Sequence, residues 1–335
     1  MSDFISRVPL LNAISDERQS SVISYMTGDR RQLETQISPE VIDLFVEHLD
    51  EIGPTNKISL LLYTSGGDTA AAWRLVNLLH TFCDELEVIV SAKALSAGTL
   101  ISLGANKIVM TKQAALGPID PSINHPLNPL IPNAPHIKAP VSVEAIRGYL
   151  DAAGEMGIKD SVSLTKILID LSDKVHPLVL GQIFRSREQI RFLAKKLLKR
   201  QIDDEDKTKE IIDFLCAESG SHDYTINRRE ARELGLRVEN PSDDLYGLLR
   251  SLHLSYVDEL KLLEPYDPYS LLGGNQEAHY SLPRAIIESV KVGSHRFLSE
   301  GTVTRSVIQQ MGPAGPFAQE SISDNRKFEG WRKFS

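Results

Sequence analysis

Apolar residues early in the chain predict a strand that leads into a tight turn and then a helix. The run at 58–63 is almost unbroken, so we expect its strand to be buried on both faces, as in a parallel sheet. The sequence SGG (65–67) follows, and apolar residues then recur at helical spacing over 70–82. Adjacent glycines permit positive φ and leave backbone N–H groups accessible, so this turn is a candidate binding element.

The same order of elements is predicted a second time. An apolar run at 86–90 precedes the sequence LSAG (95–98), a helix is expected over 97–104, and a further strand is expected over 107–110. Strands and helices that alternate in this way predict a parallel or mostly parallel sheet with helices packed on it. The sequence is therefore expected to have an α/β fold.

The rest of the chain is expected to add helices and then a β-rich end. Outside the two units we predict a strand at 22–26, a helix after 38–40 with Ser38 as N-cap, a proline-rich loop over 117–141, helices over 143–153, 163–171, 186–198 and 207–216, and helices capped by Asn227 and Ser242. We predict one large domain over 1–264, a small β-rich extension over 265–310 and a flexible tail over 311–335.

Composition limits the function more than the fold. The 335 residues are 41% hydrophobic and 24% charged, as in ordinary globular proteins, and the net charge of −8 argues against a nucleic-acid binder. Cys83 and Cys216 lie in apolar stretches and are expected to be free buried thiols, which suits the cytoplasm. We expect no signal peptide, no membrane segment, no metal site and no cofactor, because the sequence has none of their motifs.

Together, the two turns carry the residue types that acyl transfer needs. Ser96 begins a helix, where the helix dipole favours developing negative charge, and it is our candidate nucleophile. The N–H groups of Gly67 and Ala97, with that of Gly66, are candidates for an oxyanion hole. Two simpler interpretations stay open, since serine is a common helix N-cap and paired glycines also serve turns that need positive φ.

Longer segments around these turns carry a family resemblance. They are TSGGDTAAAWRLVNLL (64–79), AKALSAGTLISLGANKIVM (92–110), ALGPIDP (115–121), HPLVLGQIFRSREQIRFLAKKLL (176–198) and SHDYTINRREARELGL (221–236). With them the chain resembles the serine dehydrogenase proteinase family, a relative of Clp protease and signal peptide peptidase A. The resemblance implies a Clp/crotonase-like fold of repeated ββα units with helical insertions, peptide or protein substrates, and a homo-oligomer.

The general base has two candidates. The resemblance implies a triad of Ser96 with Asp120, which follows the serine helix, and His222, the best placed of the nine histidines. The alternative is Lys138, because signal peptide peptidases of this superfamily use a serine–lysine dyad. Their lysine lies a few dozen residues after the serine and just before a helix, as Lys138 does.

Peptide hydrolysis through an acyl-enzyme on Ser96 is thus the predicted activity. Two other functions remain open on the same fold. One is crotonase-type acyl-CoA chemistry, which uses an oxyanion hole but no serine nucleophile. The other is a non-catalytic Clp-like scaffold or binding subunit.

Overall fold

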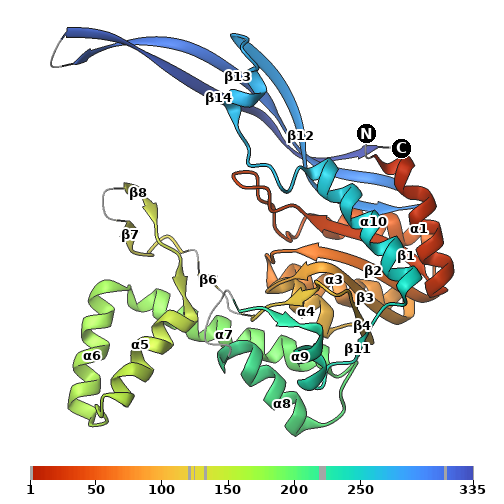
Figure 1. Ribbon diagram of the computed structural model, residues 1–335. Coiled ribbons are helices and arrows are strands. Elements are labelled where there is room, and N and C mark those ends of the chain that lie inside the picture. Colours follow the sequence, from red (N-terminus) through yellow and green to blue (C-terminus); the bar gives the residue numbers. More distant parts are fainter. Residues whose placement is uncertain are drawn as a thin grey trace.

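A twisted sheet runs through the computed structural model, which describes residues 3–119, 122–123, 125–131, 134–218, 224–312 and 315–334 (Figure 1). The strands are ordered β10–β5–β3–β2–β1–β12–β13–β14, and β4 and β11 lie off this path, with β4 paired to β3. The strands of this sheet are β1 (Ser21–Thr27), β2 (Thr55–Thr64), β3 (Cys83–Ala94), β4 (Lys107–Met110), β5 (Ala115–Leu116), β10 (Ile226–Asn227), β11 (Val238–Glu239), β12 (Glu277–Ser289), β13 (Gly293–Gly312) and β14 (Gly315–Phe334).

Helices and short strand pairs make up the rest of the described chain. The helices are α1 (Phe4–Arg18), α2 (Val41–Ile52), α3 (Thr69–Phe82), α4 (Ala97–Leu103), α5 (Val143–Glu155), α6 (Ser161–Lys174), α7 (Pro177–Leu198), α8 (Glu205–Asp213), a π-helical turn (Phe214–Glu218), α9 (Arg228–Glu233), α10 (Asp243–Leu260) and α11 (Pro268–Leu272). The short strands are β6 (Ser122–Ile123), β7 (Leu130–Ile131), β8 (Ala134–Lys138) and β9 (Val141–Ser142).

The parallel half of the sheet confirms the predicted fold class. β1, β2, β3 and β4 run parallel and contain the four apolar runs expected in this part of the chain. The leucines at 60–62 are fully buried, as a strand between two helical layers requires. Because parallel strands end at the same edge of a sheet, the turn after β2 and the serine after β3 are brought together there.

Helices cover both faces of the sheet, which gives three layers (Figure 1). On one face the main core joins the sheet to α2, α3, α4 and parts of α7 and α8. On the other face a second core joins the sheet to α1 and α10. Cys83 and Cys216 are both buried and form no disulfide in the described part of the chain, as predicted. Within the described ranges, none of the helices has the length and hydropathy that crossing a bilayer requires.

A helical arm stands beside this layered body (Figure 1). It is the described part of 122–184, and it comprises β6–β9, α5, α6 and the first half of α7. The arm has its own small core, formed by Val141, Val143, Ile146, Leu171, Val175, Val179, Leu180 and Ile183. We predicted an irregular loop over 117–141, but β6 pairs with β9 and β7 with β8, so short ladders satisfy part of its backbone.

The C-terminal part of the chain widens the sheet. β12 pairs antiparallel with β1, β13 with β12, and β14 with β13, and the last two form a long hairpin (Figure 1). The expected flexible tail over 311–335 is wrong, because 315–334 forms β14. Its polarity is that of an edge strand, yet Trp331 packs on Phe297 with ring centroids 5.7 Å apart. The division into domains at residue 264 stays a prediction.

The segment before α2 differs from the expectation in a way that shapes the site. We expected Ser38 as the N-cap with Pro39 in the first turn, but α2 begins at Val41 with Glu40 as its N-cap. Pro39 and Glu40 form a turn that leads into α2, and Ile37, just before this turn, forms a parallel bridge with the glycine turn. This bridge adds a short strand-like segment to one side of the turn.

Candidate active site

Ser96 occupies an unusual backbone position between β3 and α4. Its φ is 51° and its ψ is −113°, a combination that residues with a β-carbon rarely adopt. It is the N-cap residue of α4, but its side chain makes no capping hydrogen bond. The hydroxyl is therefore not used to cap the helix, and backbone strain of this kind is concentrated at functional sites.

The glycine turn after β2 lies directly against Ser96. A β-carbon on Gly66 would be 2.9 Å from the Ser96 Cβ and 3.3 Å from its Oγ. A β-carbon on Gly67, whose φ is 144°, would be 2.3 Å from the Ile37 carbonyl oxygen. Only glycine fits both positions, because the turn touches the serine on one side and the segment before α2 on the other.

Two backbone N–H groups at the site have no acceptor in the described part of the chain. They belong to Gly67 and to Ala97, the first residue of α4. The bridge with Ile37 uses the Gly66 carbonyl, which accepts the Ile37 N–H at 2.9 Å, and leaves the Gly67 N–H free. We expected Gly66 as a further oxyanion donor, but its N–H donates to Thr64 Oγ1 at 3.0 Å.

Thr99 ties the serine helix to the chain segment that leads toward Asp120, and the sequence reasoning missed it. The side chain is fully buried, and Oγ1 lies 2.9 Å from the Ala94 carbonyl oxygen and 2.8 Å from that of Gly117. The same oxygen accepts the Gly117 N–H at 3.0 Å. A polar residue within the apolar sequence of α4 was the signal that could have found it.

The described residues do not bring a base to Ser96. Asp120 and His222 lie outside them. Lys138 is the last residue of β8, where it pairs with Leu130, and its side chain is exposed. In the chain as described, no side chain is hydrogen-bonded to Ser96 Oγ. The fold thus brings Ser96 together with the N–H groups of Gly67 and Ala97, and a base is left to the proposal below.

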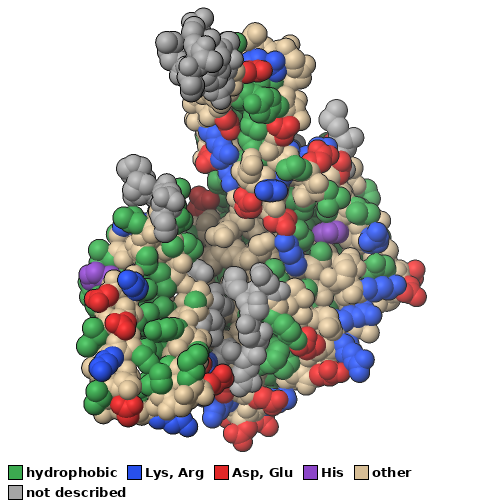
Figure 2. Space-filling model, turned by 60° about the vertical axis from the view of Figure 1, so that its left-hand side comes forward, with side chains coloured by type: hydrophobic (Ala, Val, Ile, Leu, Met, Phe, Trp, Pro, Cys, Tyr) green, Lys and Arg blue, Asp and Glu red, His purple; other side chains and the backbone are tan. Residues whose placement is uncertain are grey.

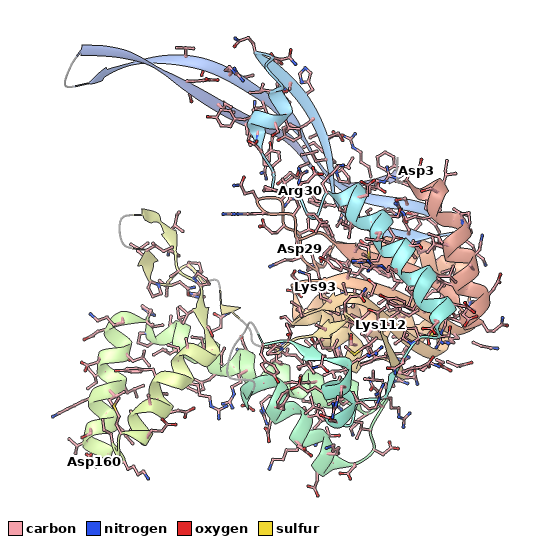
Figure 3. All side chains as sticks on the ribbon, viewed as in Figure 1. Asp3, Asp29, Arg30, Lys93, Lys112 and Asp160 are labelled. Atoms are coloured by element: carbon pink, nitrogen blue, oxygen red, sulfur yellow. The ribbon has the colours of Figure 1, made fainter. Side chains whose placement is uncertain are left out.

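Three charged or polar groups brace the strand ends at the same edge of the sheet. Tyr63 donates its hydroxyl to Asp29 Oδ1 at 2.8 Å, and Lys93 forms an ion pair with Asp29 Oδ2 (Figure 3). Burial, together with the Asp29 carboxylate, raises the pKa of Tyr63 well above its usual value. These groups join the ends of β2 and β3 to the residues after β1, and all three are engaged with one another.

A groove of about 690 Å³ lies beside the glycine turn. Asp68 and Ile37 line its end next to the turn, and Arg284 of β12, Phe297 of β13 and Trp331 of β14 contribute to its wall. Trp331 Nε1 donates to Glu40 Oε1 at 3.1 Å across this groove. The groove therefore offers aromatic and charged side chains close to the residue that follows Gly67.

Comparison with known proteins finds a matching family model and similar proteins. The model of a family described as ClpP-like SDH-type serine proteinase matches residues 4–258. An uncharacterised protein of Methanocaldococcus jannaschii is 30% identical over 253 residues, which is 73% of this chain and 78% of that protein. A second uncharacterised protein of the same organism is 31% identical over 57% of this chain and 56% of its own length.

Two solved structures of proteases also match the chain, with low sequence identity and low TM-scores. A mutant form of the 1510-N membrane-bound stomatin-specific protease is 18% identical, with a TM-score of 0.37 over 62% of this chain and 76% of that chain. ClpP1 from Listeria monocytogenes is 14% identical, with a TM-score of 0.37 over 70% of this chain and 97% of that chain.

Proposed function

The chain belongs to the family of ClpP-like SDH-type serine proteinases, and from this premise we propose that it hydrolyses peptide bonds through an acyl-enzyme on Ser96. One observation carries the proposal. Ser96, with a strained backbone and no capping bond, lies against a glycine turn, and the N–H groups of Gly67 and Ala97 have no acceptor in the described chain. These are the nucleophile and the donors that acyl transfer requires.

In the proposed reaction Ser96 Oγ attacks the carbonyl carbon of the scissile peptide bond. A base takes the serine proton, and the negative charge moves to the former carbonyl oxygen. The N–H groups of Gly67 and Ala97 bind that oxyanion, and the position of Ala97 at the start of α4 adds the favourable end of the helix dipole. As the tetrahedral intermediate collapses, the base gives the serine proton to the leaving nitrogen, and the amine product is released. Water then attacks the acyl-enzyme, the base takes the water proton and passes it to Ser96 Oγ, and the acid product leaves.

For the base we propose His222, oriented by Asp120, with Lys138 as the alternative. The neighbours of the two triad residues support this choice. Gly117, shortly before Asp120, is tied to the serine helix by Thr99, and Ile226, shortly after His222, is buried in the main core. Burial favours the neutral form that a lysine base needs. The Lys138 side chain is exposed instead, which makes Lys138 the second choice.

We propose a peptide or protein substrate bound in extended form beside the glycine turn, and a homo-oligomeric assembly in the cytoplasm. The groove next to the turn supports the first, since it offers space for side chains that flank the scissile bond. Apolar residues exposed on the arm support the second, and they include Val162, Leu168, Ile169, Leu178 and Phe184 (Figure 2). Size measurement in solution tests the assembly.

Turnover of a quenched fluorescent peptide mixture tests the proposed activity. Ser96→Ala is expected to abolish it, and Ser102→Ala is a matched control. Ser102 lies in the same helix, and its hydroxyl donates to the Gly98 carbonyl at 2.9 Å. Acyl-CoA turnover that survives Ser96→Ala would favour crotonase-type chemistry instead. A wild-type protein with no turnover and no reaction with serine-directed probes would favour the scaffold.

A further inference from the structure

A buried pair of threonine hydroxyls lies next to the glycine turn, at the ends of the adjacent strands β1 and β2. Thr27 ends β1 and Thr64 ends β2, and their side chains are almost fully buried. Thr27 Oγ1 donates to Thr64 Oγ1 at 2.7 Å. Neither residue was singled out by the sequence, and neither takes part in the reaction proposed above.

Thr64 uses its whole hydrogen-bonding capacity on the turn and on its partner. A hydroxyl has one proton to donate and two lone pairs to accept with. Thr64 Oγ1 accepts the Thr27 hydroxyl proton and the Gly66 N–H, the latter at 3.0 Å, and its own proton points to the Gly66 carbonyl oxygen at 3.3 Å. The hydroxyl therefore fixes both polar groups of Gly66, the residue before the oxyanion donor Gly67.

The other atoms of Thr64 reach the serine side of the site. Its carbonyl oxygen accepts the Leu95 N–H at 3.0 Å, immediately before Ser96 in the chain. Its Cγ2 atom fills the space beside Gly98, where an added β-carbon would be only 2.4 Å away. One buried residue thus contacts the glycine turn, the residue before the nucleophile and the first turn of α4.

We propose that Thr64, oriented by Thr27, is a positioning residue that sets the spacing between the Gly67 and Ala97 N–H groups. The inference rests on the proposed function, because it assigns these groups to the oxyanion hole. An oxyanion hole works when its donors are held about 2.7–3.1 Å from the position of the charged oxygen, and not of the substrate carbonyl. A loss of this spacing weakens binding of the transition state much more than binding of the substrate.

The direct test is Thr64→Val, which keeps the branched shape and the methyl contact but removes the hydroxyl. We expect kcat to fall roughly 10- to 100-fold, because displacements of about 1 Å have effects of that order, while KM stays close to the wild-type value. Affinity for a peptide boronate, which forms a tetrahedral adduct with the serine, should fall by a similar factor. Thr64→Ser, which keeps the hydroxyl, should restore most of both quantities.

Two further variants keep the test decisive. Thr27→Val removes only the donor to Thr64 and should give the same pattern with a smaller fall in kcat. Thr111→Val is the matched control, because Thr111 is also buried and its hydroxyl donates to the Ser91 carbonyl at 2.7 Å, away from the turn. That control should retain wild-type kcat and boronate affinity.

The proposal would be overturned if Thr64→Val kept the wild-type kcat and boronate affinity. If Thr64→Val does not fold, wild-type values in Thr27→Val would overturn it instead. An equal loss in Thr111→Val would also overturn it, because the effect would then be general destabilisation. Failure of the proposed function gives a different result. In that case the boronate would form no adduct with Ser96 even in the wild-type protein.

Discussion

The fold holds the region around Ser96 and the helical arm in different ways. Around Ser96, Thr64, Ala97 and Thr99 are fully buried in the main body, and hydrogen bonds connect the glycine turn to both neighbouring segments. The arm has only its own small core and exposes many large apolar side chains (Figure 2). The region around Ser96 is therefore held in place by the main sheet, and the arm is not part of that arrangement.

This difference bears on the choice of base. Lys138 lies on β8 in the arm, so a dyad would join the rigid serine region to a part of the molecule with separate packing. The segments next to Asp120 and His222 are attached to the main body instead, through Gly117 and Ile226. The comparison favours a triad assembled on the main body, and variants in the two regions should separate the two mechanisms.

The largest expected effect contrasts the nucleophile with the arm. Ser96→Ala should reduce kcat by roughly 10⁶-fold, the loss typical of a missing serine nucleophile. Lys138→Ala should keep most of the activity, because we place the base elsewhere. Initial rates with one peptide substrate measure both. A comparable loss in Lys138→Ala would show that a residue of the arm takes part in catalysis, and the distinction between the two regions would then be wrong.

The next effect concerns the base itself. His222→Ala should reduce kcat by roughly 10⁴-fold or more, since a serine without its base is a weak nucleophile. In the wild-type protein kcat/KM should rise with pH near about 6.5, the ordinary pKa of histidine, because the base acts in its neutral form. A rise only at clearly higher pH, with an active His222→Ala variant, would instead identify a lysine.

A substitution in the turn sharpens the account of the preorganised region. Gly67→Ala should reduce kcat by roughly 100- to 1,000-fold, because its β-carbon would meet the Ile37 backbone and displace an oxyanion donor. Gly273→Ala is the matched control, since Gly273 also has positive φ, 52°, but open space around it. Equal activity of the two variants would show that the Gly67 N–H is not used.

Loss of the hydrogen bonds between Thr99, in the serine helix, and Gly117, in the segment before Asp120, should have a smaller effect on kcat. Thr99→Val removes the hydroxyl that bonds Gly117, so that segment should shift relative to α4. We expect kcat to fall roughly 10- to 100-fold. The rise of kcat/KM with pH, measured in parallel, should be displaced, which would show an altered pKa for the base. A variant with lower stability but an unchanged pH profile would reduce Thr99 to a packing role.

A histidine pair away from both regions predicts an effect on stability alone. His48 Nδ1 lies 2.7 Å from Ser289 Oγ, and its Nε2 lies 3.0 Å from His295 Nδ1. Burial lowers the pKa of His48 from 6.5 to about 3, and it also lowers the pKa of His295. Below pH 6.5 the unfolded chain binds protons that the folded chain does not, so the free energy of unfolding should fall as pH falls toward 3.

Denaturant unfolding at several pH values measures this slope, with His48→Gln as the comparison. The variant cannot take up that proton in either state, so its free energy of unfolding should depend less steeply on pH over the same range. An identical slope in both proteins would mean that His48 is not the titrating group.

Much of the main body could be predicted from the sequence, because buried parallel strands are apolar runs and helix caps are local. Asn227 and Ser242 cap α9 and α10 as expected, with side-chain oxygens that accept N–H groups two or three residues ahead. The polar β14 could not be recognised, since its pairing with β13 does not depend on an apolar pattern. Threonine contacts were also hidden, because Thr27 and Thr64 are 37 residues apart.

At the site, local sequence motifs could be recognised but contacts between strands could not. Ser96, Gly67 and Ala97 stand in short sequence motifs, and the apolar strands that precede these motifs could be predicted. The occupied N–H of Gly66 was not, because its acceptor is a side chain whose orientation depends on a neighbouring strand. Pairing between strands decides such details, and a single sequence does not contain it in readable form.

Mapping the adduct of a fluorophosphonate probe by peptide mass spectrometry tests the central claim most directly. The wild-type protein should carry one phosphonyl group on the peptide that contains Ser96, and Ser96→Ala should carry none while Ser102→Ala reacts normally. The fraction of peptide hydrolysis that is lost should be proportional to the fraction of protein that is labelled. An adduct on another serine, or peptide hydrolysis that persists in Ser96→Ala, would contradict the assignment of Ser96 as the nucleophile.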